Sequence, residues 1–212
     1  MSLLELLTSV GLIVVLSALS LVIFNRLKVS SANIKCVSNL RVSGTLLQAY
    51  ITDSRQRLVT RVRGDTLAPY RFWTEQLWRS YLNAQPKAWQ VLQCPAEKGS
   101  NDKSVWFWYT YGLNMYDARG RHYKPNPAVD AYIYELDVNR IDQPSKTVLL
   151  ADSFNGGSYQ SVRLGSPPLL KDGIDLRHDR KGNVFFFDGH IQAVDRQEAI
   201  DLGIPNIYPK NP

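Results

Sequence analysis

The sequence predicts an α+β protein in which one long N-terminal helix packs on a head containing a small, mostly antiparallel sheet. An apolar run opens the chain and continues as a helical pattern, short β-prone segments alternate with loops rich in Gly and Pro, and a tight-hairpin signal lies near the C-terminus. We divide the chain into the apolar half of the helix (1–24), its amphipathic half (25–55) and the head (56–212).

The apolar run, Met1 to Phe24, contains one charged residue, Glu5. A run of roughly 20 such residues is long enough to cross a bilayer core. An unpaired carboxylate in hydrocarbon costs at least about 2.5 kcal/mol, so Glu5 requires a cation. The nearest candidates are the α-amino group of Met1, if Met1 is the true terminus, and the same group on a neighbouring copy.

The helical pattern continues beyond this run. A stripe on one helical face consists of Val29, Cys36, Leu40, Leu47 and Tyr50. Because no proline occurs before Pro69, we expect one helix of about 50 residues, with its second half packed on the head.

Basic residues are concentrated just after the apolar run. The net charge is +6, and the segment 25–64 holds Arg26, Lys28, Lys35, Arg41, Arg55, Arg57, Arg61 and Arg63 against the single acid Asp53. Such a cluster fits a solvated surface, a surface for nucleic acid or anionic lipid, or a topology signal. Tyr50 is the only aromatic residue among these positions, which argues against a nucleic-acid stacking surface.

The two cysteines are Cys36 and Cys94. In a chain whose apolar start suggests export, they predict a disulfide that closes a loop of about 58 residues and contributes roughly 4 kcal/mol in the chain-entropy model. Two buried free thiols are the alternative. Without a CxxC pattern, the cysteines do not predict a metal site.

The first part of the head predicts one helix and one strand. Residues 69–82 begin with a proline suited to a first helical turn and place aromatic residues on one face, which predicts a short amphipathic helix. Residues 105–111 are β-prone, and 117–127 read as a loop because they contain Gly and two prolines.

The second part of the head predicts a buried strand and a hairpin. Residues 147–151 are mostly apolar and predict the strand, whereas 155–175 are rich in Gly and Pro and predict a long loop. Residues 183–194 predict the hairpin. A short helix follows, with Asp195 and Glu198 as its capping box.

The first residues carry a family resemblance. Met-Ser-Leu-Leu-Glu-Leu-Leu before an apolar run resembles the mature start of type IV pilins and type II secretion pseudopilins. Met1 stands where Phe is usual, and no basic leader precedes it, so we interpret the leader as already removed by a prepilin peptidase. The resemblance implies that Glu5 pairs with the Met1 amine of an adjacent subunit.

A second motif lies near the C-terminus. His178 is followed by nine residues and then Asp188-Gly189, which resembles the H-x9-DG domain found C-terminal to prepilin-type N-termini in many bacterial proteins. Asp188-Gly189 is also a strong tight-turn signal. We expect His178 to hydrogen-bond this turn and Gly189 to supply positive φ, so that the three residues fix the hairpin register.

Two other interpretations of the motif are a metal site and a catalytic site. Asp152, His178, Asp188 and His190 offer oxygen and nitrogen ligands, and some of the pseudopilins that this chain resembles hold calcium in a C-terminal loop, although His is a poor calcium ligand. Ser153 with His178 and Asp188 would suit nucleophilic chemistry, but no nucleophile elbow surrounds Ser153. We therefore predict no enzyme activity, and no cofactor unless calcium or another metal binds.

Together these features predict a structural subunit of an extracellular pilus-like or pseudopilus filament. Its partners would be copies of itself, the inner-membrane assembly machinery and the prepilin peptidase. It would reside in the inner membrane before assembly and afterwards in a periplasmic or cell-surface filament. The alternative is a signal-anchored surface binding domain or hydrolase that does not polymerise.

Overall fold

The computed structural model describes residues 3–59, 61–63, 70–96, 106–108, 110–114, 123–126, 130–156, 160–161, 163–164, 172–204 and 206–208. Side chains are not described at 4–6, 9, 19, 21–29, 59, 61–63, 70–71, 106, 123–126, 130–135 and 163. The α-helices are α1 (Leu3–Asp53), α2 (Trp73–Ser80) and α3 (Arg196–Asp201). Short 3-10 helices are η1 (Ala88–Leu92), η2 (Trp106–Trp108), η3 (Val138–Arg140) and η4 (Pro144–Lys146).

The strands form several small sheets. They are β1 (Arg57–Val59), β2 (Arg61–Arg63), β3 (Tyr70–Phe72), β4 (Gly112–Asn114), β5 (Tyr123–Asn126), β6 (Asp130–Asp137), β7 (Val148–Ala151), β8 (Ser153–Phe154), β9 (Arg163–Leu164), β10 (Gly173–Asp175), β11 (Gly182–Phe186), β12 (Ile191–Val194) and β13 (Ile207–Tyr208). Their orders are β12-β11-β7-β4-β9, β1-β6-β5, β13-β10-β8 and β2-β3. Among the described strands, β4 with β9 and β10 with β13 pair in parallel, and the other pairs are antiparallel.

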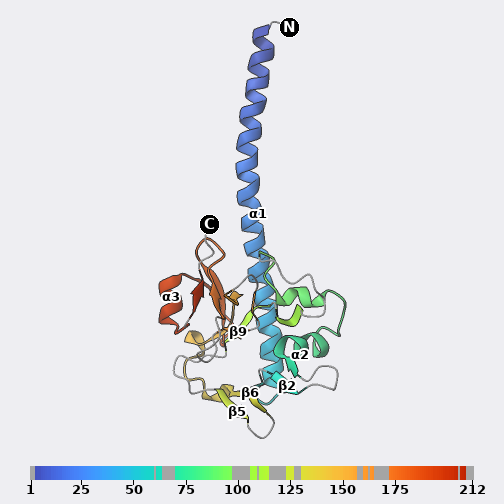
Figure 1. Ribbon diagram of the computed structural model, residues 1–212, viewed down its shortest axis with the longest axis vertical. Helices are drawn as coiled ribbons and strands as arrows, with labels where there is room; N and C mark the ends of the chain where they lie inside the picture. Colours follow the sequence, from blue (N-terminus) through green and yellow to red (C-terminus); the bar gives the residue numbers. More distant parts are fainter. Residues whose placement is uncertain are drawn as a thin grey trace.

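The C-terminal part of α1 packs against the head. Its fully buried apolar side chains recur at helical spacing, at Cys36, Leu40 and Leu47. They belong to the main core cluster, which also includes Leu150 of β7 and Phe185 of β11. In Figure 1, this part of α1 lies between α2 and the C-terminal strands, and it contacts η1, β11 and β7.

The packing of α1 on the five-stranded sheet is close at Gly44. A Cβ atom added there would lie 2.5 Å from the ring of Phe185, which is 1% exposed. Gly44→Ala is therefore expected to destabilise the protein, because overpacking costs typically 1–3 kcal/mol and outweighs the helix propensity of Ala, about 1 kcal/mol. Denaturant unfolding of the purified protein measures the change.

Gly11→Ala is the matched control, since a Cβ atom at Gly11 would meet nothing within 4 Å. Gly11→Ala, the same substitution in the same helix, should leave the stability of the head unchanged. If Gly44→Ala proved as stable as Gly11→Ala, the close approach of α1 to Phe185 would be wrong.

The fold class predicted from the sequence is wrong. Within α1, the stretch that packs on the other elements and whose side chains are described without interruption is 30–53. The predicted architecture, a long stalk helix on a head with one small sheet, is therefore withdrawn. The head also contains several small sheets rather than one. They arise because loop segments of the head pair locally in short strands, as β5 does with β6. Among the residues that the structure describes, no helix offers a stretch long and apolar enough to cross a membrane.

Two predicted elements in the first part of the head need correction. The helix predicted over 69–82 begins only at Trp73, because the residues before it form β3 and pair with β2. The strand predicted over 105–111 is replaced by η2, and β4 begins just after it. Aromatic packing accounts for this difference. The ring centroids of Phe107 and Trp108 lie 5.9 and 4.3 Å from that of Phe72, the residue just before α2, so the segment turns toward α2.

The two predicted loops each contain strands. The loop at 117–127 holds β5, which includes Pro125 and lies at the edge of its sheet, where a proline is tolerated. The loop at 155–175 holds β9 and β10. The strands in both segments pair through backbone groups, whatever their side chains, so the amino-acid composition of the segments did not predict them.

The C-terminal predictions are confirmed. The hairpin consists of β11 and β12, with Phe185 opposite Ile191. At the start of α3, the Glu198 N–H donates to Asp195 Oδ1 at 3.0 Å, and the Asp195 N–H donates to Glu198 Oε2 at 2.8 Å. This is the predicted capping box.

Candidate functional site

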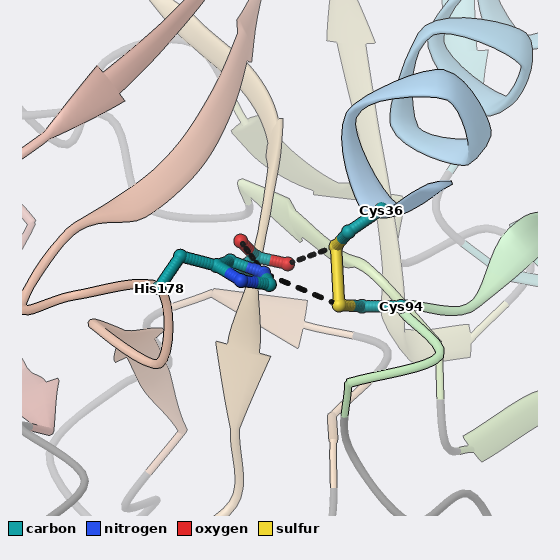
Figure 2. Close-up of side chains that lie close together, drawn as sticks. Cys36, Cys94 and His178 are labelled. Atoms are coloured by element: carbon teal, nitrogen blue, oxygen red, sulfur yellow. Dashed lines mark hydrogen bonds and ion pairs between the residues drawn. A yellow bond between two sulfur atoms is a disulfide. The ribbon is translucent and has the colours of Figure 1, made fainter. Parts of the chain in front are cut away.

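Four buried side chains from distant parts of the sequence meet beside α1. They are Cys36 of α1, Cys94 after η1, Asp152 between β7 and β8, and His178 between β10 and β11. One ligand atom from each lies within 4.8 Å of the others. Figure 2 shows His178 pointing toward the bond between the two cysteines. We call these residues the cysteine–histidine cluster.

The predicted disulfide is confirmed. Cys36 and Cys94 are bonded, with their Cα atoms 4.6 Å apart and 58 positions apart in the sequence. Gln160 holds the backbone of Cys94 on both sides: the Cys94 N–H donates to Gln160 Oε1 at 3.1 Å, and Gln160 Nε2 donates to the Cys94 carbonyl at 3.0 Å. The bond therefore joins α1 to the segment after η1 inside the core.

Tyr111 supports Cys36 from the sheet side. Its hydroxyl donates to the Cys36 carbonyl at 2.7 Å and lies 3.4 Å from Cys36 Sγ. Burial raises the pKa of Tyr111 well above its usual value, and the negative charge of Asp152 raises it further. Tyr111 thus remains a neutral donor at physiological pH.

Asp152 is fixed by its backbone and by one side-chain oxygen. Its N–H donates to the Asn183 carbonyl at 2.9 Å, and the Asn183 N–H donates to Asp152 Oδ2 at 2.8 Å. The other oxygen, Oδ1, lies 3.1 Å from Cys36 Sγ. A disulfide sulfur carries no proton, so this short approach is a contact and not a hydrogen bond in the oxidised protein.

His178 is positioned by a tight turn that joins β10 to β11. Its N–H and carbonyl pair with Lys181, and the two residues between, Asp179 and Arg180, have φ values of 53° and 60°. Two central residues with positive φ are typical of a type I′ hairpin turn. His178 Nε2 lies 3.4 Å from Cys94 Sγ and 3.4 Å from Asp152 Oδ2.

Asp188 and Gly189 lie at the other end of β11. Gly189 has φ of 93°, as predicted for the turn, and Asp188 Oδ1 lies 2.6 Å from His190 Nδ1. The His190 ring stacks on Phe186, with centroids 4.1 Å apart. Desolvation raises the pKa of Asp188, but hydrogen bonds from His190 outweigh it and hold that pKa below its usual value.

The predicted pairing of His178 with the Asp188-Gly189 turn is therefore corrected. The two parts of the motif flank the five residues of β11, and a strand rises about 3.3 Å per residue, so they are separated by roughly 15 Å. The predicted metal ligands divide in the same way. Asp152 and His178 lie in the buried cysteine–histidine cluster, whereas Asp188 and His190 form a partly exposed pair.

The remaining predicted site residues also have defined places. Ser153 Oγ lies 2.8 Å from the Thr110 carbonyl and 2.6 Å from the Ser161 carbonyl, and it accepts from the Ser161 N–H at 3.0 Å. These bonds tie loops together, which is a structural role for a buried hydroxyl. Met1 and the side chain of Glu5 lie outside the described residues.

The sequence interpretation did not join the disulfide to Asp152 and His178, and it missed Tyr111 and Gln160 as supports. The helical stripe placed Cys36 on the inner face of α1, but no spacing connects Cys94 to His178. Only the pairing of β7 with β11, with Ala151 opposite Val184, brings Asp152 close to the start of β11.

No family model, curated protein or solved structure matches this chain.

Proposed function

We propose that this chain is a structural subunit of an extracellular filament of the type IV pilus or pseudopilus class, and that it assembles with copies of itself through the first part of α1. One observation carries the proposal: between Leu3 and Leu16, the large apolar side chains of α1 that the structure describes are 54–78% exposed. They are Leu3, Leu7, Val10, Leu12, Ile13, Val14, Val15 and Leu16. We call them the apolar segment.

The apolar segment needs partners on every side of the helix. Leu12 to Leu16 are five consecutive residues, and successive residues of an α-helix point about 100° apart, so exposed apolar side chains surround the axis. A helix that is apolar all round is a buried helix. Each such side chain gains about 1.5–3 kcal/mol when it is fully buried. A filament core, where several copies surround each helix, provides this burial, whereas a two-fold dimer covers one face only.

Glu5 favours another copy of this chain as the partner of the apolar segment. It is the single charged residue in 1–24, and an unpaired carboxylate is costly in apolar surroundings. In the resembling pilins, the amine of an adjacent subunit pairs with the corresponding glutamate. Pairing of Glu5 with the Met1 amine of a neighbour would fix the axial register of the filament.

The disulfide supports an exported structural role. Disulfides persist in oxidising compartments outside the cytosol. Here the bond between Cys36 and Cys94 ties α1 to the head within the core. A mechanical force on the apolar segment of an assembled subunit is therefore transmitted from α1 to the head through this disulfide.

The test compares two charged substitutions on exposed apolar residues of the same helix. Val14 is 62% exposed within the apolar segment, and Ile34 is 68% exposed outside it. Val14→Asp should abolish filament formation, because each subunit would bury a carboxylate at a cost of at least about 2.5 kcal/mol. Ile34→Asp should leave it intact. The full chain is purified in detergent, the detergent is removed, and the samples are imaged by electron microscopy.

Dispersed particles from the wild-type chain would favour the alternative, a surface binding domain or hydrolase that does not polymerise. Normal filaments from Val14→Asp would overturn the role of the apolar segment. Normal filaments from Glu5→Leu would remove the pairing with Met1 while leaving the burial argument in place.

A further inference from the structure

Independently of the filament role, we propose that the chain with Cys36 and Cys94 reduced binds one Zn²⁺ ion at the cysteine–histidine cluster. The ligands are the two cysteine thiolates, His178 Nε2 and a carboxylate oxygen of Asp152. The disulfide and the metal are alternative states of one site, because a sulfur bonded to its partner cysteine is no longer a thiolate ligand.

The donor set and its spacing suit zinc. Thiolate, imidazole and carboxylate are the protein ligands of Zn²⁺, and four of them complete a tetrahedral site. Ligand atoms about 2.0–2.3 Å from a tetrahedral ion lie roughly 3.3–3.8 Å from one another. Cys94 Sγ to His178 Nε2 and His178 Nε2 to Asp152 Oδ2 both measure 3.4 Å, and Cys36 Sγ to Asp152 Oδ1 measures 3.1 Å. Reduction requires the two sulfurs to move apart, and the Asp152 carboxylate must turn so that one oxygen faces both Cys36 and His178, which its two oxygens now face separately. Cys94 and His178 already have the required spacing.

The orientation of the Asp152 carboxylate suits the reduced protein better than the oxidised one. Its Oδ1 atom faces Cys36 Sγ, which has no proton to donate while the disulfide is formed. In the reduced protein the same atom would accept the Cys36 thiol proton, or share a metal with the thiolate. The contact between His178 Nε2 and Cys94 Sγ is similarly suited to a thiol or a metal.

Residues around the ligands hold them in place. The Asn183 N–H fixes Asp152 Oδ2, the Tyr111 hydroxyl fixes the Cys36 carbonyl, and Gln160 fixes the Cys94 backbone. Such outer partners orient metal ligands and tune their basicity. All four ligand residues are buried, so bulk water does not compete with them for the ion.

The chemistry balances with a phosphine as the reductant. The phosphine attacks one sulfur and the S–S bond breaks. Water then converts the phosphine to its oxide and supplies the protons for two thiols. Zn²⁺ displaces both thiol protons to solvent and forms two Zn–S bonds. No further oxidant or reductant is needed for metal binding.

Burial defines when the site is available. Cys36 and Cys94 are 0% and 1% exposed, so a reductant does not reach the bond in the folded protein. The zinc-binding state is therefore that of the chain before its disulfide forms. In that state the metal would hold α1 against the head in place of the covalent bond.

The experiment unfolds the full chain in denaturant with a phosphine reductant and refolds it with Co²⁺ or Zn²⁺. Co²⁺ is a spectroscopic substitute for Zn²⁺. The refolded reduced chain should take up one equivalent of Co²⁺, with an absorption band from thiolate-to-cobalt charge transfer, and Zn²⁺ should displace it. The oxidised chain should show no such band.

Variants separate this site from others. Cys94→Ser should reduce the charge-transfer band, and His178→Gln and Asp152→Asn should each weaken Zn²⁺ binding by about tenfold or more. The matched control removes a carboxylate and an imidazole from the exposed pair instead: Asp188→Asn with His190→Gln should change neither the band nor the affinity.

Four results would overturn the proposal. One is a reduced chain that refolds, as judged by circular dichroism, and takes up no metal. Another is a reduced chain that stays unfolded with Zn²⁺ present. The third is equal metal binding by the oxidised chain. The fourth is loss of binding in the Asp188 and His190 control. For a variant that fails to refold, the Co²⁺ affinity is compared with that of the reduced wild-type chain kept unfolded in denaturant, so that loss of folding and loss of a ligand are measured separately.

Discussion

Serine at both Cys36 and Cys94 is expected to lower the free energy of unfolding by about 4 kcal/mol. The bond closes a loop of 58 positions, and the chain-entropy model gives roughly this value for a loop of that length. The loss also leaves two buried hydroxyls in the core, where Cys36 Sγ lies 3.4 Å from the Tyr111 hydroxyl, which adds to the cost. Chemical denaturation followed by circular dichroism measures the change.

The wild-type chain refolded in a phosphine with a metal chelator is the control, since it lacks the bond and retains both sulfur atoms. It should be destabilised by a similar amount. A double variant within about 1 kcal/mol of the wild type would show that the bond does not constrain α1 against the head.

The second large effect is expected at Asp152. Asp152→Ala should lower the free energy of unfolding by about 3–5 kcal/mol, because it leaves the buried Asn183 N–H and the buried His178 ring without this carboxylate. The side chains of Asp152 and His178 are 0% and 4% exposed, so water does not replace the lost contacts. Urea unfolding under oxidising conditions isolates this effect from the disulfide.

The chain provides a matched control in its second aspartate–histidine pair. Asp188 and His190 lie 2.6 Å apart, but their side chains are 36% and 40% exposed. Exposed ion pairs contribute about 0–1 kcal/mol, so Asp188→Ala should have a small effect. Equal costs at Asp152 and Asp188 would contradict the account of a buried, preorganised cluster.

Elements with a local signal could be predicted from the sequence. Asp195 and Glu198 satisfy each other's backbone N–H groups, so their identities alone marked the start of α3. The turn at Asp188-Gly189 is equally local, since Gly189 tolerates a positive φ that most residues avoid. Cys36 was placed on the inner face of α1 by helical periodicity.

Features that depend on tertiary pairing could not be predicted in this way. β5 and β10 lie in segments whose Gly and Pro content favours loops, and only their partner strands make them strands. The cysteine–histidine cluster is of the same kind. His178 reaches Cys94 because its turn starts β11, which pairs with β7 and so carries His178 to Asp152.

The expected link between His178 and the Asp188-Gly189 turn shows how a sequence motif can mislead. Nine intervening residues suggest a hairpin contact, but they include the whole of β11, so the two ends of the motif lie apart. Each end instead has a histidine–aspartate contact of its own, one buried and one exposed.

The central claim is that copies of this chain assemble through the apolar segment. The most direct test is an electron cryomicroscopy reconstruction of the assembly formed by the wild-type chain after detergent removal. The account predicts a helical filament with Leu3 to Leu16 of every subunit packed together along the axis and the heads outside. A filament with these residues on its outer surface, or a sample containing only dispersed single subunits, would contradict it.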